Sequence, residues 1–194
     1  SKKFIVATVA RNIPCIERFL ISARARHTPP LRYNEGEKHL YLGEAYKLVV
    51  HAGAKHKNQV EIMHGDIHVW ASIPAKIQAE LQKWYSHQAW EVFQDRLVEV
   101  SRHAPWVQHR KIHFKTRRMK RTWGNCSSTG LIKLNTHLVK APVTIIDSVV
   151  AHELCHLEEM NHSPVFYTLL ETLNPDWRDD RAKLRSEGFI YLRT

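Results

Sequence analysis

The sequence predicts an α+β protein, and three patterns in its 194 residues lead to this expectation. Strand-like pieces separated by turn residues fill the stretch 39–71, which indicates a small sheet. Apolar residues then recur at helical spacing over 74–101, and they do so again after Pro142. A run of strands followed by a run of helices is typical of the α+β class, and the length suits one domain with at most a small appendage.

Residues 1–73 are expected to hold an N-terminal helix and an antiparallel β meander. The apolar run Phe4–Val9 is typical of a strand, and Ile13–Arg26 carries its apolar residues at helical spacing. Glycine-containing turns separate four further pieces, which consecutive hairpins would join into a meander. These pieces are His39–Leu42, Tyr46–His51, Gln59–Met63 and Ile67–Ala71.

Residues 74–194 are expected to form the second part, with the boundary near Ser72–Pro74. Pro74 begins a long helix that reaches about Ser101, and its apolar and aromatic stripe is interpreted as core. The stretch after it alternates like a strand, then reads as a loop, then as another strand. These three segments are Val107–Lys115, Lys120–Thr129 and Leu131–Thr136.

Three helices are expected to complete the chain. Pro142 begins the first, because proline is tolerated in the first turn, and Asn161 could end it in a left-handed conformation. Ser163 is a plausible N-cap for the second. The last helix is expected from Asp176 to about Glu187, with Gly188 as its stop.

Composition narrows the classes of function. The formal net charge of +10 favours polyanionic partners or acidic substrates. The three cysteines (Cys15, Cys126 and Cys155) form no C-x-x-C pair, which fits a reducing compartment, so a cytoplasmic, intracellular protein is expected. No apolar run approaches about 18 residues, and no signal-peptide pattern is visible, so no membrane association is expected.

The segment 151–162 reads A-H-E-L-C-H-L-E-E-M-N-H and contains the motif H-E-x-x-H. On a helix, His152 and His156 share one face and can direct two imidazoles at one ion, while Glu153 lies close enough to act on a water at that ion. His162 could supply a third ligand if the helix stops between Leu157 and Asn161. A catalytic Zn²⁺ takes three protein ligands and leaves its fourth position for water. The motif therefore predicts a zinc hydrolase with Glu153 as the general base.

A chance match has to be weighed, because the chain has 14 histidines. The apolar residues of this segment recur at spacings of three and four, so the segment is an amphipathic helix with the histidine face beside the apolar face. These residues are Val143, Ile146, Val150, Leu154 and Leu157. This context favours a zinc site over ordinary surface histidines.

The third ligand has two candidates. The spacing H-E-x-x-H-x5-H is also that of metzincins, but Glu159 replaces their glycine and no methionine follows His162, so a metzincin is not expected. In thermolysin-type enzymes the third ligand is a glutamate on the next helix, which makes Glu171 the competitor. We favour His162. Inert packing is the interpretation for Cys155, and also for Cys126, which could approach the site from a loop. The pairs His64/His68 and His109/His113 are assigned no ligand role.

A basic run, 110–121, leads into the loop before the metal helix. Such a run is usually a solvated face, but a positive rim beside a zinc cleft could hold DNA or another polyanion. The candidate nucleic-acid contacts are Lys115, Arg117, Arg118, Lys120 and Arg121.

The following segments extend over most of the chain: His39–Gly43 with Tyr46, the stretch Trp123-Gly124-Asn125-Cys126-Ser127 with Ile132–Asn135, the metal motif Val149–His156, Asn161–Pro164 with Phe166, and Pro175–Trp177. Taken together, these segments resemble the YgjP-like predicted metallopeptidases, relatives of the SprT/Spartan and WLM proteases. The chain departs from the family pattern at two places: Asn125 replaces its usual serine, and Arg121-Thr122 inverts its Thr-Arg.

The resemblance implies a zincin-like metallopeptidase core, made of a small mixed sheet and the H-E-x-x-H helix, with His162 as third ligand. It also implies that Trp123, Gly124, Asn125 and Cys126 border a cleft in which an extended substrate could add to a sheet edge. The SprT and WLM relatives cut proteins crosslinked to DNA, so DNA is an expected partner by analogy only. The resemblance supplies no natural substrate.

Three functions compete at this point. The leading hypothesis is a metallopeptidase with one Zn²⁺ per chain that cleaves peptide bonds of a protein or peptide substrate. The alternative is a nucleic-acid-associated module in which zinc is structural or activity is latent; an intact Glu153 argues against it, because a structural site has no use for that carboxylate. A third is a zinc hydrolase of a non-peptide amide or ester. The sequence leaves the oligomeric state open.

Overall fold

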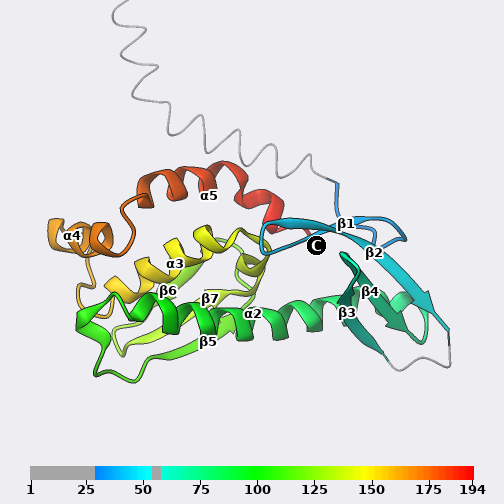
Figure 1. Cartoon of the computed structure of the whole chain (residues 1–194), viewed down its shortest axis with the longest axis horizontal. Helices are drawn as coiled ribbons and strands as arrows, with labels where there is room; N and C mark the ends of the chain where they lie inside the picture. Colours follow the sequence, from blue (N-terminus) through cyan, green and yellow to red (C-terminus); the bar gives the residue numbers. More distant parts are fainter. Residues whose placement is uncertain (1–28, 54–57) are drawn as a thin grey trace, which may run out of the picture.

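The computed structural model describes residues 29–53 and 58–194. The strand predicted at Phe4–Val9 and the helix predicted at Ile13–Arg26 lie outside the described residues. The described chain contains two sheets and four α-helices, which confirms the α+β class (Figure 1).

The first sheet is mixed, with the strand order β1-β2-β4-β3. Its strands are β1 (Lys38–Tyr41), β2 (Glu44–Ala52), β3 (Gln59–Met63) and β4 (Asp66–Ala71). The strand positions agree with the prediction, but β2 and β4 run parallel, so the predicted antiparallel meander is wrong. The prediction assumed that consecutive strands are neighbours, which holds for only about two-thirds of strand pairs.

Strand β4 is an inner strand of the first sheet, because it pairs with β2 on one side and with β3 on the other. Ile67, Val69 and Ala71 alternate along it and are all fully buried, so one of its faces packs on the core. Strand β3, at the edge of the sheet, is more exposed.

Helix α2 (Ile77–Ser101) follows the short 3₁₀ helix η1 (Pro74–Lys76) and contacts strands of both sheets. Figure 1 shows it running along the length of the molecule. Its buried residues recur mainly every fourth position, so one stripe faces the core, as predicted. They are Ile77, Leu81, Tyr85, Ala89, Phe93, Leu97 and Val100.

The second sheet has the order β5-β7-β6, and its strands are β5 (His113–Arg117), β6 (Gly124–Cys126) and β7 (Leu131–Asn135). The predicted strand 107–115 is wrong over its first half, because Pro105–Val107 forms the 3₁₀ helix η2 and the strand begins only at His113. The predicted loop 120–129 is also wrong in part, because it contains β6. Strand β6 is recognisable only through its pairing with β7, since three residues are too few to show a periodicity.

Helix α3 (Val143–Cys155) follows the 3₁₀ helix η3 (Thr136–Lys140) and packs against α2, α4, α5 and β6. It ends earlier than predicted, and Asn161 has no positive φ, so the predicted left-handed C-cap at Asn161 is wrong. The indole N–H of Trp106 donates to the carbonyl of Leu154 at 3.0 Å, and Arg110 donates to that of Leu157 at 2.5 Å. These long-range donors satisfy carbonyls at the helix end and make a longer helix unnecessary.

Helix α4 (Pro164–Leu173) begins as predicted, because the Ser163 hydroxyl accepts a hydrogen bond from the N–H of Phe166. Helix α5 (Trp177–Tyr191) continues through Gly188, so the predicted stop at that glycine is wrong. A Cβ at Gly188 would lie 2.8 Å from Cζ2 of Trp123. The glycine therefore allows α5 to approach the Trp123 indole closely rather than ending the helix.

The first sheet is joined to the rest of the chain through η3. The N–H groups of Leu42 and Gly43 donate to the carbonyls of Val139 and Lys140 at 2.9 and 3.1 Å. The domain boundary near Ser72–Pro74 stays a prediction. None of the helices in residues 29–53 and 58–194 combines the length and apolar character that crossing a membrane requires.

Candidate metal centre

Three histidine side chains converge at the C-terminal end of α3. The Nε2 atom of His152 lies 3.2 Å from Nε2 of His156 and 3.1 Å from Nε2 of His162. Two nitrogens bound to one tetrahedral zinc at about 2.0–2.1 Å would lie about 3.3 Å apart. Two of the three separations are therefore close to those of a tetrahedral zinc site, and the three ligand atoms all lie within 4.8 Å of one another. No other such cluster occurs in the part of the chain that the structure describes.

The neighbours of the histidines orient their rings. Nδ1–H of His156 donates to the carbonyl of Glu159 at 3.1 Å, which leaves the lone pair of Nε2 for the cluster. The ring of Phe166, which is fully buried, packs against all three imidazoles with ring centroids 4.6–4.9 Å apart. Hydrogen bonding and packing thus hold the three Nε2 atoms toward one point.

The chain reaches His162 through a tight turn between two helices. Helix α3 ends at Cys155, and the backbone N–H of Asn161 donates to the Glu159 carboxylate at 3.0 Å. His162 directly precedes Ser163, the N-cap of α4. The sequence correctly placed His162 at a helix junction, although the junction begins earlier than expected.

Glu153 lies on α3 beside the histidines and is only 4% exposed. Its Oε2 atom has no hydrogen-bond partner in the structure. On its other side is Gly124 of β6, where a Cβ would lie 2.5 Å from Oε1. Burial raises the pKa of Glu153 to about 8, because a low-dielectric surrounding penalises the charged carboxylate.

The electrostatics of the cluster suit a divalent cation. Burial, followed by the charges of His156, His162 and Arg181, lowers the pKa of His152 to about 3, and the pKa of His162 is also lowered, mainly by burial. A metal binds only the neutral imidazole, so the lowered pKa of His152 and of His162 favours the metal-binding form of these two side chains. An unpartnered buried carboxyl beside three imidazole nitrogens fits a dication, whose charge would offset the cost of burying the carboxylate.

A cavity of about 380 Å³ opens onto the cluster. Trp123 and Gly124 line it, whereas Asn125 and Cys126 do not. Substrate contact by these residues stays a prediction. Asn125 is exposed, and Cys126 is half-buried, with its thiol donating to the carbonyl of Ser127. The remaining lining residues are Thr122, Ser148, Val149, His152, Glu153, His162, Leu170, Leu184, Tyr167, Trp177 and Arg181.

Sequence reasoning missed Arg181 as a residue of this cleft. Trp177 and Arg181 are four residues apart on α5, so one helix face presents both to the cavity. Arg181 forms no ion pair within the described residues, and its positive charge contributes to lowering the pKa of His152 and of His162. The spacing Trp177–Arg181 was visible in the sequence, but nothing local indicated that this face meets α3.

Glu171 and Cys155 lie outside the histidine cluster. The Glu171 carboxylate is exposed and accepts from Arg178 at 2.5 Å. The Cys155 side chain is fully buried. His68, one of the histidines given no ligand role, stacks on His51.

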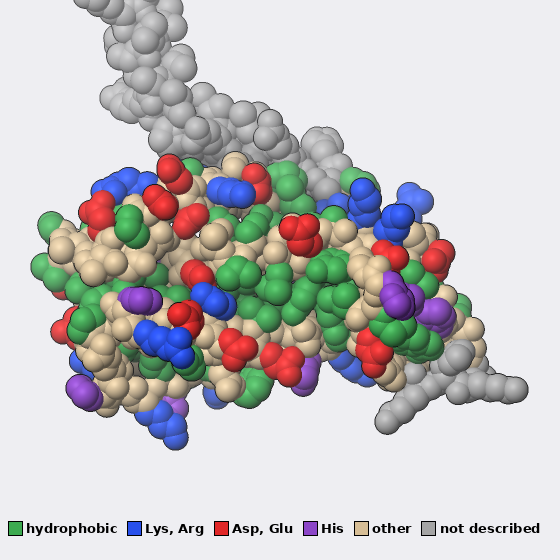
Figure 2. All heavy atoms as spheres, viewed as in Figure 1, with side chains coloured by type: hydrophobic (Ala, Val, Ile, Leu, Met, Phe, Trp, Pro, Cys, Tyr) green, Lys and Arg blue, Asp and Glu red, His purple; other side chains and the backbone are tan. Residues whose placement is uncertain are grey.

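The five basic residues predicted to contact nucleic acid are all exposed, and in the described part of the chain none of them pairs with a carboxylate. They are Lys115, Arg117, Arg118, Lys120 and Arg121. On the face shown in Figure 2, acidic and basic side chains are interspersed and form no continuous basic surface. Arg110, from the same run, instead bonds to the end of α3.

An α+β fold that gathers three histidines around one point, with a buried glutamate beside them, defines the metallopeptidase class. Comparison with known families agrees with this class. The chain belongs to the YgjP-like family: the family's model, described as YgjP-like, metallopeptidase domain, matches residues 1–187. The resemblance and the metallopeptidase class predicted from the sequence are therefore confirmed.

Two solved structures similar to this chain are metallopeptidase zymogens. Abylysin from Pyrococcus abyssi is 19% identical, with a TM-score of 0.45, over 49% of this chain and 93% of its own. Jannalysin from Methanocaldococcus jannaschii is 17% identical, with a TM-score of 0.39, over 50% of this chain and 92% of its own. A search of curated proteins found no match.

Proposed function

We propose that this protein is a zinc-dependent peptidase that hydrolyses a peptide bond of a protein or peptide substrate, with one zinc ion per chain. The observation that carries the proposal is the convergence of His152, His156 and His162 at Nε2 separations of 3.1 and 3.2 Å. These three residues would hold the metal. Zn²⁺ supplies a Lewis acid that polarises a carbonyl and lowers the pKa of water to about 7.

Glu153 is proposed as the group that moves the proton. Its carboxylate takes a proton from the attacking water and gives it to the amine nitrogen as the carbon–nitrogen bond breaks. The residue is suited to this role because it is buried beside the histidines and Oε2 has no other partner. Gly124 supports this role, because a side chain at position 124 would collide with the Glu153 carboxyl and displace it.

The edge strand β6 is proposed to hold the substrate. It pairs with β7 on one side only, so its other edge can accept an extended peptide through backbone hydrogen bonds. Trp123, which precedes this strand, and Arg181, from α5, both line the cleft and would meet side chains of the peptide. An available sheet edge favours a peptide over a small non-peptide amide or ester.

A purely structural zinc fits the site less well. Structural zinc sites are closed by four protein ligands, and the described residues bring three histidines together. Nucleic-acid contact through Lys115, Arg117, Arg118, Lys120 and Arg121 stays a prediction. Its support is the exposure of these five cations and the net charge of +10.

Metal analysis tests the ligand set. We expect about one equivalent of zinc in wild-type protein purified without chelator, and a large loss of zinc from His162→Ala, because removing one of three ligands opens the site. Glu171→Ala is the matched control for the competing ligand and should keep its zinc, since its carboxylate pairs with Arg178. Zinc retained in His162→Ala and lost in Glu171→Ala would reverse the assignment.

Gly124→Ala should lower turnover of a peptide substrate by about 10²-fold or more, because a Cβ would lie 2.5 Å from Oε1 and 2.8 Å from Cδ of Glu153 and displace the proposed base. Zinc content should change little, since the three Nε2 atoms lie elsewhere. The measurement is kcat on any substrate found, with metal analysis alongside. Ser128→Ala, an exposed change after the same strand, is the control. Unchanged kcat in Gly124→Ala would contradict the role of this contact.

A further inference from the structure

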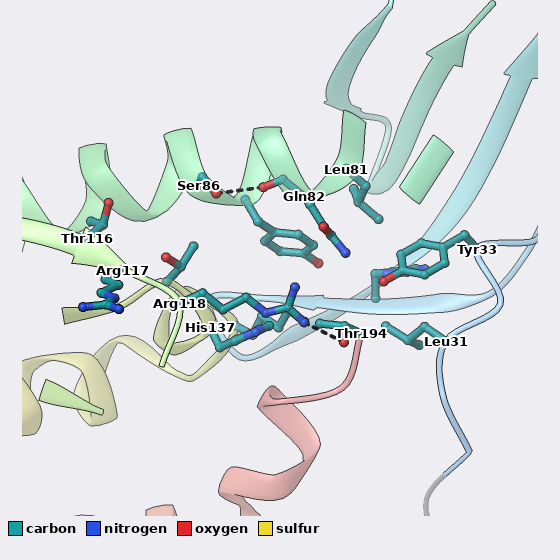
Figure 3. Close-up of a pocket in the computed structure, with 14 residues that line it drawn as sticks. Leu31, Tyr33, Leu81, Gln82, Ser86, Thr116, Arg117, Arg118, His137 and Thr194 are labelled. Carbon is teal, nitrogen blue, oxygen red and sulfur yellow. Dashed lines mark hydrogen bonds between the residues drawn. The ribbon is translucent and has the colours of Figure 1, made fainter. Parts of the chain in front are cut away.

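A second cavity, of about 260 Å³, shares no lining residue with the metal cleft. Five segments that are distant in the sequence surround it: the start of the first sheet, α2, the end of β5, η3 and residue 194 (Figure 3). Because this cavity is separate from the histidine cluster, a ligand bound in it would not be the peptide bond that the metal cleft is proposed to hydrolyse.

Three basic residues, Arg117, Arg118 and Lys140, line this cavity without a carboxylate partner, and the last two of them are held by hydrogen bonds at the C-terminal end of the described chain. Lys140 is 5% exposed, and its Nζ donates to the backbone carbonyl of Arg193 at 2.6 Å. Arg118 extends into the cavity in Figure 3 and donates to the Thr194 hydroxyl at 2.9 Å. No Asp or Glu side chain in the described residues pairs with Arg118 or Lys140. Burial, with the charges of Arg118 and Arg193, lowers the pKa of Lys140 to about 8. An anion between Arg118 and Lys140 would offset this cost.

Two buried histidines line further sides of the cavity. His39 is 2% exposed, and its Nε2 lies 3.3 Å from the Glu37 carboxylate, which also accepts the backbone N–H groups of Arg32 and Tyr33. The one N–H of a neutral His39 ring is therefore directed at Glu37. His137 is 9% exposed, and burial lowers the pKa of both histidines to about 4. A neutral His137 retains one N–H donor at neutral pH.

The remaining wall combines apolar surface with the polar side chains of Gln82, Ser86, Thr116 and Thr136. The Tyr85 hydroxyl donates to the Leu40 carbonyl at 2.6 Å, so its ring forms a wall and its polar atom is occupied. Leu31, Leu81 and the Tyr33 ring add apolar surface. A small organic group could pack here while an anionic group meets the cations.

We propose that this cavity binds a small phosphate monoester, with Arg118 and Lys140 on the phosphate oxygens and His137 as an additional donor. Donors that approach from several sides suit a tetrahedral anion with several oxygens better than a planar carboxylate with two. The apolar walls would hold the organic part, which points to a ligand of the size class of a nucleoside monophosphate. The site is independent of the proposed peptidase activity.

Titration calorimetry at fixed ionic strength tests the site, with inorganic phosphate, adenosine monophosphate and adenosine as probes. We expect the monophosphate to bind, inorganic phosphate to bind more weakly, and adenosine not to bind. If inorganic phosphate bound as tightly as the monophosphate, the result would support the anion site but overturn the proposed apolar subsite for the organic group. Adenosine binding as tightly as the monophosphate, or no binding by any probe, would overturn the proposal.

Two charge-matched variants separate a built site from general electrostatic attraction. Arg118→Gln should weaken monophosphate binding by about tenfold or more, because it removes a charge-assisted donor from the cavity. Arg121→Gln changes the net charge equally, but Arg121 does not line the cavity, so binding should change by less than about twofold. Both residues are exposed, so both variants should fold. Equal weakening in the two variants, or no weakening in Arg118→Gln, would overturn the proposal.

Discussion

Glu153→Gln is expected to lower kcat on a peptide substrate by about 10²- to 10⁴-fold, while zinc content stays unchanged. The glutamine amide has nearly the shape of the carboxylate and fits the space left by Gly124, but it cannot accept the proton of the attacking water. The three ligand nitrogens are not altered. Parallel measurements of kcat and of zinc per chain therefore separate a proton-transfer role from a metal-binding role.

The control for this variant is Glu158→Gln. Glu158 lies just beyond the same helix, but it is exposed and pairs with Arg110 at 3.1 Å, so its loss should leave kcat within about twofold. If Glu153→Gln kept full activity, the proposed base would be wrong. If it lost zinc along with activity, Glu153 would act on the metal site rather than on the proton.

Removal of zinc should destabilise the protein, and His152→Ala should abolish this dependence. The three histidines join the end of α3 to the start of α4, so metal binding adds to the free energy of unfolding. A ligand present at about 1,000 times its Kd contributes about 4 kcal/mol, and we expect a chelator to lower the wild-type Tm by several degrees. His152→Ala should begin with a lower Tm that the chelator does not change.

Differential scanning calorimetry with and without chelator makes this comparison. His109→Ala, an exposed histidine outside the cluster, should behave like the wild type. A wild-type Tm that did not respond to chelator would contradict a tightly held metal. A response in His152→Ala as large as in the wild type would indicate that the metal binds elsewhere.

The elements that sequence patterns predicted well are those whose signals are local. Helix α2 was predicted because one face buries a residue nearly every four positions, and α4 because Ser163 caps it. The proposed ligands His152 and His156 came from the same kind of reasoning, since four-residue spacing on a helix brings two side chains together wherever the helix lies. Local spacing also placed Glu153 beside them.

Tertiary structure decided everything that depends on residues far apart in the chain. The insertion of β4 between β2 and β3, the pairing of β6 with β7 and the early end of α3 all follow from long-range hydrogen bonds. A glycine in the sequence indicates freedom of the backbone, but it does not show that Gly124 makes room for Glu153 or that Gly188 makes room for Trp123.

The metal cleft and the second cavity show the same difference between what local sequence determines and what tertiary structure decides. The sequence by itself determined the presence of the described helices, the strand positions of the first sheet and the H-E-x-x-H motif, because each rests on interactions within a few residues. Only the packed chain brought Arg181 to the metal cleft, and only the packed chain gathered His39, Arg118 and Lys140 around a separate basic cavity. Burial and pairing energies depend on which surfaces meet, and that choice is made by the whole core at once rather than by any one segment.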